Sequence, residues 1–345
     1  MTAGWVPGVR EALAGAAGGA VIGAEEAREY APLPDVIEAV REAVAWEADG
    51  RVGIPDARRA ALRYAPPADE GGALRVAAVA KCCVVPDLGL AGFRFLGSVL
   101  GDDPVRYLYL VGLARRNLLA TIDEHLTYVR RIAALAVVVA QHIVPAPEPV
   151  VGVIGAGRLA RAVLEALVES RRAGEIIVTS RRASSRDALA RDLAEAGAPR
   201  VTAADSAAEV AGRADFLVTA TNAAAPVLRA AWVKPGATVY GLGDAIELGD
   251  DLLVRRERGS VRLIVSNWLE CAQRADFRRL IADGRIDRSD VDAELADVIA
   301  GTAPARLGRR DIVCVRAPGS VALDVFVGAR ICARRLQIQR QQTRG

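Results

Sequence analysis

Residues 150–160 read Val150-Val-Gly-Val-Ile-Gly155-Ala-Gly157-Arg-Leu-Ala160, and an amphipathic stretch with helical spacing follows them. Such a run predicts a strand, a tight turn and a helix whose N-terminus faces a pyrophosphate. Gly155 would form the turn, Gly157 would let the backbone approach the phosphates, and Ala160 would let the helix pack on the strand. We therefore expect a dinucleotide at Gly155, Ala156, Gly157, Arg158, Leu159 and Ala160. The alternative is a glycine turn of an α/β domain that binds nothing.

Alternating strands and helices continue from this turn. The pattern predicts strands over 150–154, 175–179, 215–219, 237–241 and 311–316, and helices over 158–170 and 184–196. This alternation is typical of a doubly wound parallel sheet of the Rossmann type. Three prolines, at 145, 147 and 149, form a stiff linker in front of the first strand. We accordingly place a dinucleotide-binding domain at residues 145–318.

The residues before the linker have a different pattern. A helix is predicted over 35–50, with Asp35 as its cap and Gly50 at its end, and another over 126–143. Between them lie three short β-like segments, 74–80, 91–96 and 106–111. Residues 1–144 are therefore expected to form a separate α+β domain, and a last helix is predicted over 320–337.

The end of the second Rossmann strand indicates which dinucleotide is bound. Forms of this fold that bind NAD place an acidic residue there to accept the ribose hydroxyls. This chain has Ser180, Arg181 and Arg182 instead. Guanidinium groups bind a 2′-phosphate in bidentate fashion, so we favour NADP(H) and keep NAD(H) as the alternative. Thr221, after the strand 215–219, is a small residue expected to lie along the cofactor.

Basic residues on apolar segments of the N-terminal domain predict an anion pocket. Arg75 and Lys81 are six residues apart on one strand and therefore share a face. Arg94 lies on the next β-like segment, and Arg130 lies on the following helix. A carboxylate is the natural ligand of such a set, although ordinary charges at a strand edge are the alternative. Lys81 stands out because it and Lys234 are the only lysines among 45 basic residues.

One acidic residue is a candidate for proton transfer. Asp244 follows the predicted strand 237–241, and ligands of doubly wound sheets bind at the carboxyl ends of the strands. It would orient an amine or relay a proton there. The alternative role is that of a helix cap for the segment that follows.

Composition bounds the class of protein. The 345 residues suffice for two domains, 52% of them are hydrophobic, and no segment has the ~20 uncharged apolar residues of a membrane span. Five cysteines without a CxxC pair and only two histidines argue against a metal site and favour a reducing cytoplasm. The net charge of +3 is spread along the chain, and no nucleic-acid-binding motif is present.

Several stretches, taken together, resemble the ornithine cyclodeaminase/μ-crystallin family over roughly residues 30–340. They are Val36–Ala45, Leu74-Arg75-Val, Leu119-Ala-Thr-Ile-Asp123-Glu-His-Leu-Thr127-Tyr-Val-Arg130, Gly155-Ala-Gly157, Ala214-Asp215, Thr219-Ala-Thr221, Trp232-Val-Lys-Pro-Gly236 and Gly319-Ser-Val-Ala-Leu-Asp324. Their order and spacing are more specific than any one of them. The resemblance explains Lys234 as part of a turn and leaves Lys81 unexplained.

The resemblance implies a fold and an activity. Members of the family have an N-terminal domain for dimerisation and substrate binding, completed by the C-terminal helix (residues 319–345 here), and a Rossmann domain. They are typically homodimers that act on the C–N bond of α-amino acids or imino acids. Arginines that bind the substrate carboxylate in the family fall on Arg75 and Arg130. The family's active-site lysine aligns with Arg94, or with Lys81 if a loop has shifted.

Two motifs of the family are altered in this chain. The usual Arg-Thr-Ala is Arg130-Arg131-Ile132, and the acidic motif is the short Asp244-Ala-Ile-Glu247-Leu248 without its usual proline. These departures favour a divergent substrate and put Asp244 in doubt as the catalytic acid.

Three hypotheses follow from the residues and the resemblance together. The first is an NADPH-dependent ketimine reductase or amino-acid dehydrogenase, in which Lys81 or Arg94 polarises or protonates the imine nitrogen. The second is a cyclodeaminase that recycles one bound NAD⁺ with no net redox change. The third is a non-catalytic protein that binds a nucleotide or a small ligand.

Overall fold

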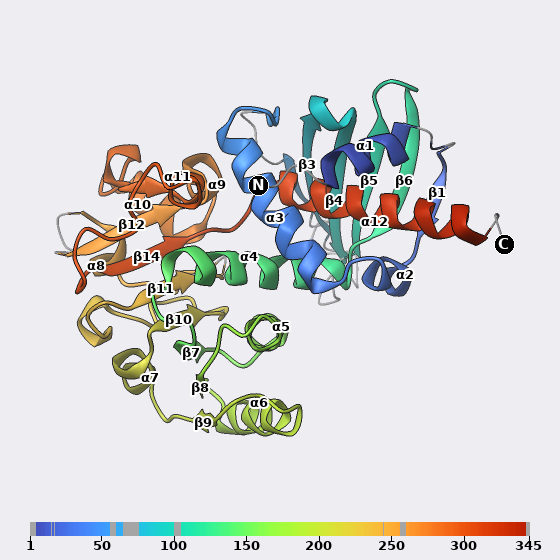
Figure 1. Ribbon diagram of the computed structural model, residues 1–345. Coiled ribbons are helices and arrows are strands. Elements are labelled where there is room, and N and C mark those ends of the chain that lie inside the picture. The colour runs from blue at the N-terminus through green and yellow to red at the C-terminus, as the bar shows by residue number, and fades with distance from the viewer. Residues whose placement is uncertain are drawn as a thin grey trace, which may run out of the picture. The chain divides into compact units, whose positions relative to one another are not determined.

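A computed structural model describes residues 5–14, 16, 18–55, 60–64, 76–99, 105–243, 245–255 and 260–342 (Figure 1). The chain divides into two compact units, the first made of Met1–Arg131 with Ser320–Gly345 and the second of Ile132–Gly319. The division falls inside the helix Thr127–Ile143, and the sequence places it at the proline linker that follows. Arg75 and Asp244, both expected in the active site, lie outside the described residues.

The described part of the first unit contains a six-stranded sheet with the order β1-β6-β5-β4-β3-β2. Its strands are β1 (Ala20–Ile22), β2 (Ala60–Tyr64), β3 (Val76–Val85), β4 (Leu90–Val99), β5 (Val105–Gly112) and β6 (Asn117–Asp123). Its helices are α1 (Trp5–Ala14), α2 (Ala24–Glu29), α3 (Leu33–Ala48), the start of α4 (Thr127–Ile143) and α12 (Val321–Gln342), with a 3-10 turn η1 (Pro86–Leu88). β1 pairs with β6 in parallel, and the other neighbours pair antiparallel.

The helix α12 covers one face of this sheet. Residues of β5 are alternately buried and more exposed, so that every second side chain points to the covered face. A Cβ atom at Gly92 of β4 would meet Val325 at 2.1 Å, and one at Gly328 of α12 would meet Leu108 at 2.4 Å. These two glycines therefore let the helix and the sheet approach closely.

The helix α3 begins before its predicted cap. Asp35 was expected to cap it, but this is wrong, because Pro32 occupies the N-cap position and Leu33 is the first helical residue. Asp35 lies in the first turn, where its carboxylate accepts a hydrogen bond from Arg334 of α12 at 3.2 Å. Gly50 follows the helix with a φ of +69°, a conformation that suits glycine.

The second unit is a doubly wound sheet, which confirms the predicted fold class. Its described strands have the order β13-β12-β14-β11-β10-β7-β8-β9, and the neighbouring pairs are parallel. They are β7 (Val150–Ile154), β8 (Glu175–Thr179), β9 (Val201–Ala203), β10 (Phe216–Thr219), β11 (Thr238–Gly241), β12 (Val261–Val265), β13 (Ala293–Glu294) and β14 (Ile312–Arg316). The helices are the rest of α4, α5 (Arg158–Glu169), α6 (Ala183–Glu195), α7 (Ala207–Arg213), α8 (Asp250–Leu253), α9 (Trp268–Cys271), α10 (Ala275–Ala282) and α11 (Leu295–Ala300), with 3-10 turns η2 (Ala230–Trp232) and η3 (Arg288–Asp290).

The strand order identifies where a ligand of this sheet would bind. β7 comes first in the sequence of the sheet and lies between β8 and β10, so the order of the strands reverses at β7. Ligands of doubly wound sheets bind at the carboxyl ends of the strands beside such a switch point. A ligand is therefore expected at the carboxyl ends of β7 and β10.

No helix in the described part of the chain is long and apolar enough to span a membrane.

Candidate active site

The glycine turn after β7 has the geometry that a dinucleotide needs. Gly155 has a φ of +122°, and a Cβ atom there would lie 2.3 Å from the carbonyl oxygen of Ala220. A Cβ atom at Gly157 would meet nothing within 4 Å. Gly157 is also the N-cap of α5, and no side chain accepts a hydrogen bond from that end of the helix. The residues fit a pyrophosphate, because the first N–H groups of α5 attract an anion and nothing on Gly157 obstructs its approach.

The other expected cofactor residues are also placed suitably. Ala160 is fully buried where α5 packs on the sheet, whereas Arg158 is exposed, and Ala156 and Leu159 are partly exposed. At the end of β8, Arg181 and Arg182 are exposed, and neither guanidinium has a hydrogen bond or ion pair with another described residue. Ser180 donates its hydroxyl to the carbonyl oxygen of Arg182 at 2.8 Å and so fixes the loop.

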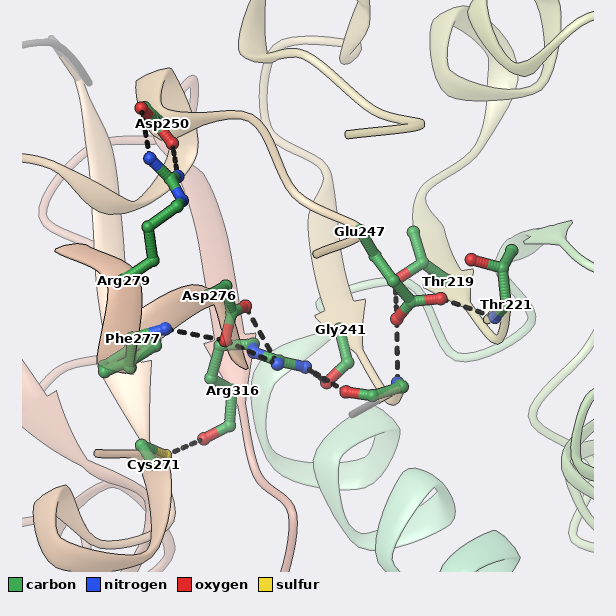
Figure 2. Close-up of polar contacts among 11 residues, drawn as sticks. Thr219, Thr221, Gly241, Glu247, Asp250, Cys271, Asp276, Phe277, Arg279 and Arg316 are labelled. Carbon is green, nitrogen blue, oxygen red and sulfur yellow. Dashed lines mark hydrogen bonds and ion pairs between the residues drawn. The ribbon is translucent and has the colours of Figure 1, made fainter. Parts of the chain in front are cut away.

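A buried carboxylate holds the two loops beside the switch point (Figure 2). Glu247 is fully buried and accepts a hydrogen bond from the Thr219 hydroxyl at 3.0 Å. It also accepts from the backbone N–H of Gly243 at 2.7 Å and from that of Thr221. The carboxylate thereby ties the loop after β10 to the loop after β11. Sequence reasoning noticed Glu247 only for its spacing, and no pattern in the sequence indicated this role.

A buried guanidinium holds the second of these loops from the other side (Figure 2). Arg316, at the end of β14, donates to the carbonyl oxygens of Gly241 at 2.7 Å and Gly243 at 3.0 Å. It is paired with Asp276 at 2.8 Å. Although burial lowers it, the pKa of Arg316 is held above its ordinary value chiefly by Asp276. The residue that follows this rigid loop is Asp244, whose role stays a prediction because it lies outside the described residues.

A second polar cluster lies in the first unit, between the sheet and α12. Arg94 of β4 is 4% exposed and donates its Nε to Glu124 at 2.6 Å. Asp324 of α12 lies 3.6 Å from the same Nε and accepts from the Nε of Arg131 at 2.8 Å. The two guanidinium groups thus share one carboxylate, and Arg94 has a second.

An aromatic ring forms the centre of this cluster. The guanidinium carbons of Arg94 and Arg106 each lie 4.8 Å from the ring centroid of Tyr128, and that of Arg131 lies 5.4 Å from it. A cation over an aromatic face gains roughly 0.5–2 kcal/mol, and more as water is excluded. Tyr128 therefore helps to hold three positive charges close together against their mutual repulsion.

Buried donor nitrogens of the cluster lack hydrogen-bond acceptors. Nη2 of Arg94 and Nη1 of Arg131 are buried without a hydrogen-bond partner among the described residues. A buried donor without a partner costs about 1–3 kcal/mol, and more when the group is charged. An anion that accepted from these nitrogens would satisfy them.

Burial and the neighbouring arginines act in opposite directions on the pKa of Glu124. Burial, assisted by the negative charge of Asp324, raises the pKa of Glu124 to about 7, and Arg94 and Arg131 oppose this rise. Although burial lowers it, the pKa of Arg94 is held above its ordinary value by Asp324 and Glu124. Arg94 therefore stays charged, and Glu124 is the member of the pair that titrates near neutrality.

The structure places the expected substrate residues in different surroundings. Arg130 donates Nη1 to the carbonyl oxygens of Ala31 at 2.8 Å and Arg28 at 3.1 Å, so it fastens α4 to the segment before α3. Its neighbour Arg131 was not expected in the site and points into the cluster. Lys81 is the register partner of Arg94 across β3 and β4, so both side chains leave the same face of the sheet.

A family model for the ornithine cyclodeaminase/mu-crystallin family matches residues 110–336. The chain belongs to this family. It is similar to the alanine dehydrogenase of Archaeoglobus fulgidus, with 25% identity over 313 residues that cover 88% of this chain and 91% of the relative. It is also similar to the ketimine reductase mu-crystallin of Mus musculus, with 30% identity over 193 residues, which are 55% of this chain and 57% of that protein.

Solved structures of the same fold cover nearly the whole chain. The Δ1-pyrroline-2-carboxylate reductase of Thermococcus litoralis, solved with NADH and L-proline, has a TM-score of 0.79 at 19% identity and covers 93% of this chain and 98% of its own. A probable ornithine cyclodeaminase from Bordetella pertussis has a TM-score of 0.75 at 25% identity, again covering 93% and 98%. The predicted family and fold class are confirmed.

Lys81 and Arg94 are register partners on adjacent strands, so their side chains lie side by side on one face of the sheet. An arginine between two carboxylates holds its proton, whereas a lysine can release one. Which of the two takes the place of the family's active-site lysine stays a prediction.

Proposed function

We propose that this chain is an NADPH-dependent oxidoreductase that acts on the C–N bond of an α-amino acid or a cyclic or acyclic imino acid. The observation that carries the proposal is the buried pair of arginines with unsatisfied donor nitrogens, since a carboxylate is the ligand that such a pair attracts. Membership of the family supports it, because its relatives include enzymes named for ketimine reduction and alanine dehydrogenation.

The cofactor proposal is based on residues of the Rossmann unit. Gly155 to Ala160 would hold the pyrophosphate, the loop containing Thr221 would lie along the dinucleotide, and Ser180, Arg181 and Arg182 would bind the 2′-phosphate. NADPH, when bound, supplies the hydride for reduction of a C=N bond. NAD(H) is the alternative, since the structural neighbours named with a cofactor contain NAD or NADH.

The substrate proposal is based on the buried cluster. We assign the substrate carboxylate to Arg94 and Arg131, whose nitrogens lack acceptors, together with Arg75 as the sequence predicts. Arg130 keeps its predicted role only if it leaves its two carbonyl partners. Lys81 would give a proton to the imine nitrogen, which makes the carbon more electrophilic. Asp244 would orient the amine or relay a proton, as the sequence predicts.

The cofactor assignment is tested with the double variant Arg181→Ala/Arg182→Ala. NADPH affinity should fall at least about tenfold while NADH affinity changes little, because only NADPH carries the 2′-phosphate. Arg191→Ala removes an exposed charge further along α6 and serves as the control. An unchanged preference between the two cofactors would refute the phosphate site.

Activity is tested by following the near-ultraviolet absorbance of NADPH with a panel of cyclic and acyclic 2-imino acids. Substrate-dependent loss of absorbance establishes the reductase and begins to define the side chain of the substrate.

A cyclodeaminase is the second candidate, favoured by the likeness to the Bordetella pertussis protein. It would instead carry tightly bound NAD⁺ and release ammonia from a diamino acid with no net loss of NADPH. Bound cofactor without turnover of either kind would indicate a binding protein.

The first unit offers a surface for a second copy of the chain. On the face of the sheet opposite α12, Val84 is 40% and Phe93 is 42% exposed, and the ring of Phe93 lies 5.9 Å from that of Tyr109. An exposed apolar face of this kind is typical of an interface. We propose a homodimer, with support from a structural neighbour described as a dimeric archaeal alanine dehydrogenase.

The five cysteines form no disulfide, which supports a cytoplasmic location.

A further inference from the structure

Glu124 occupies a position that a substrate carboxylate would compete for. It lies between β6 and α4, is 4% exposed, and accepts from the Nε of Arg94 at 2.6 Å. Arg94 also faces Asp324, which is committed to Arg131 at 2.8 Å. Of the two carboxylates, Glu124 is therefore the one whose ion pair among the described residues is with Arg94 alone.

The cluster is short of hydrogen-bond acceptors. Three guanidinium groups surround the ring of Tyr128, and Glu124 and Asp324 pair with those of Arg94 and Arg131. Nη2 of Arg94 and Nη1 of Arg131 are buried without acceptors. An incoming carboxylate can satisfy these donors. If it enters while Glu124 stays ionised, however, three carboxylates share the same buried space, and their repulsion opposes binding.

We propose that Glu124 couples substrate binding to the uptake of one proton. The substrate carboxylate replaces Glu124 as the partner of Arg94, and the Glu124 carboxylate accepts a proton from water as it is displaced. One carboxylate enters and one becomes a neutral acid, so the charge of the cluster is unchanged. The inference depends on the proposed function only for the identity of the anion.

Every element around Glu124 contributes a group that sets its protonation. Among the described residues, the charged and titratable groups around this cluster are Lys81 and Cys83 of β3, Arg94 of β4, Arg106 of β5, Tyr128 and Arg131 of α4, Asp324 of α12 and Glu47 of α3. Burial and Asp324 raise the pKa of Glu124 to about 7, and Arg94 and Arg131 lower it. A substrate carboxylate on Arg94 offsets part of the positive charge that lowers the pKa of Glu124. Binding and protonation therefore reinforce each other, as linkage requires.

The coupling is tested with pyrrole-2-carboxylate, a planar cyclic carboxylate that is ionised throughout the relevant pH range. Calorimetry on the full-length protein should show its affinity falling about tenfold between about pH 6 and about pH 8, since Glu124 then competes as an anion. In Glu124→Gln the affinity should stay near the acidic value at both pH values. Asp123→Asn removes the adjacent carboxylate, which accepts from the N–H of His125, and should leave the tenfold change intact.

A second measurement needs no variant to fold. Infrared difference spectra of the wild-type protein at about pH 8 should show a protonated carboxyl band when the probe is added, and the band should shift in protein labelled with ¹³C-glutamate. An affinity independent of pH, the absence of this band, or no binding of the probe at either pH would each overturn the inference. Turnover of imino acids with pH-independent probe binding would refute the coupling and leave the proposed function standing. Proton-coupled binding without turnover would support the coupling and refute the proposed function.

Discussion

Lys81 and Arg94 show how two basic residues on one face can have different uses. They are register partners across β3 and β4, yet Arg94 is enclosed by carboxylates and Tyr128. A guanidinium in such surroundings contributes a fixed positive charge. A lysine can exchange its proton with a reacting nitrogen. We therefore expect the chemistry of proton transfer to depend on Lys81 and the capture of the anion to depend on Arg94.

Replacement of Lys81 by methionine tests this division. Turnover in the NADPH assay should fall by ~10²–10⁴, the usual contribution of a general acid, while NADPH affinity stays unchanged. Lys81→Arg should not restore it, because an arginine keeps its proton. Lys234→Met is the matched control, since that lysine pairs with Asp215 at 2.5 Å in the other unit. Equal turnover in Lys81→Met and the wild type would disprove the role.

The free energy of unfolding should report on Glu124. Its pKa in the folded protein is raised to about 7, above the ordinary value of 4.5, so the folded state binds more protons than the unfolded state between these values. The contribution of Glu124 to stability therefore falls as pH rises from 4.5 to about 7 and is constant above that. Urea unfolding of the wild type and Glu124→Gln at several pH values isolates this contribution. Identical pH dependence in both would contradict it.

Several elements of the Rossmann unit were predictable because their patterns extend over enough residues to show a period. β7 and β8 match their predicted bounds, and α5 and α6 differ by single residues. β9 and β13, with three and two residues, are too short to show a period and were missed. β6 was missed because its burial does not alternate regularly, with Leu119 and Ala120 buried in succession.

The polar clusters were less predictable than the elements. Arg94 and Lys81 could be placed on a common surface because both lie on apolar strands. Glu124, Arg131 and Asp324 come from different elements, and no spacing in the sequence brings an arginine at 131 to a carboxylate 193 residues later. For the same reason the sequence predicted Arg130 and did not indicate Arg131, which points to the cluster from the next position on α4. Tertiary packing alone selects between adjacent residues of a helix.

The turn between β7 and α5 allows a matched pair of substitutions. Gly155→Ala should lower the free energy of unfolding by about 1 kcal/mol or more, because φ is +122° and the new Cβ atom would meet the Ala220 oxygen at 2.3 Å. Gly157→Ala should leave stability nearly unchanged, because its Cβ atom would lie in open space. Both should weaken NADPH binding. Chemical unfolding and cofactor titration measure the two effects. Similar stability losses in both variants would contradict the special backbone requirement at Gly155.

Assembly of the whole protein can be tested on the outer face of the first unit's sheet. Val84→Lys/Phe93→Glu places charges on this exposed apolar face and should convert a dimer into a monomer, because burial of unpaired charges opposes association. Light scattering after size-exclusion chromatography measures the mass. Ile281→Lys, on an exposed apolar residue of the second unit, is the control and should remain dimeric. A wild type that is monomeric at high concentration would rule out the proposed interface.

The place of α12 in the first unit has a consequence for synthesis. The sheet face that contains Gly92 and Leu108 is made before the second unit, and the helix that covers it is made only after that unit. The second unit, Ile132–Gly319, is continuous in the chain and can fold in the meantime. A nascent chain must therefore carry an uncovered apolar sheet, with Arg94 and Arg131 lacking Asp324, until the helix α12 has been made. Chaperones that bind apolar surfaces should recognise this intermediate, and ribosomes stalled before residue 320 should retain them.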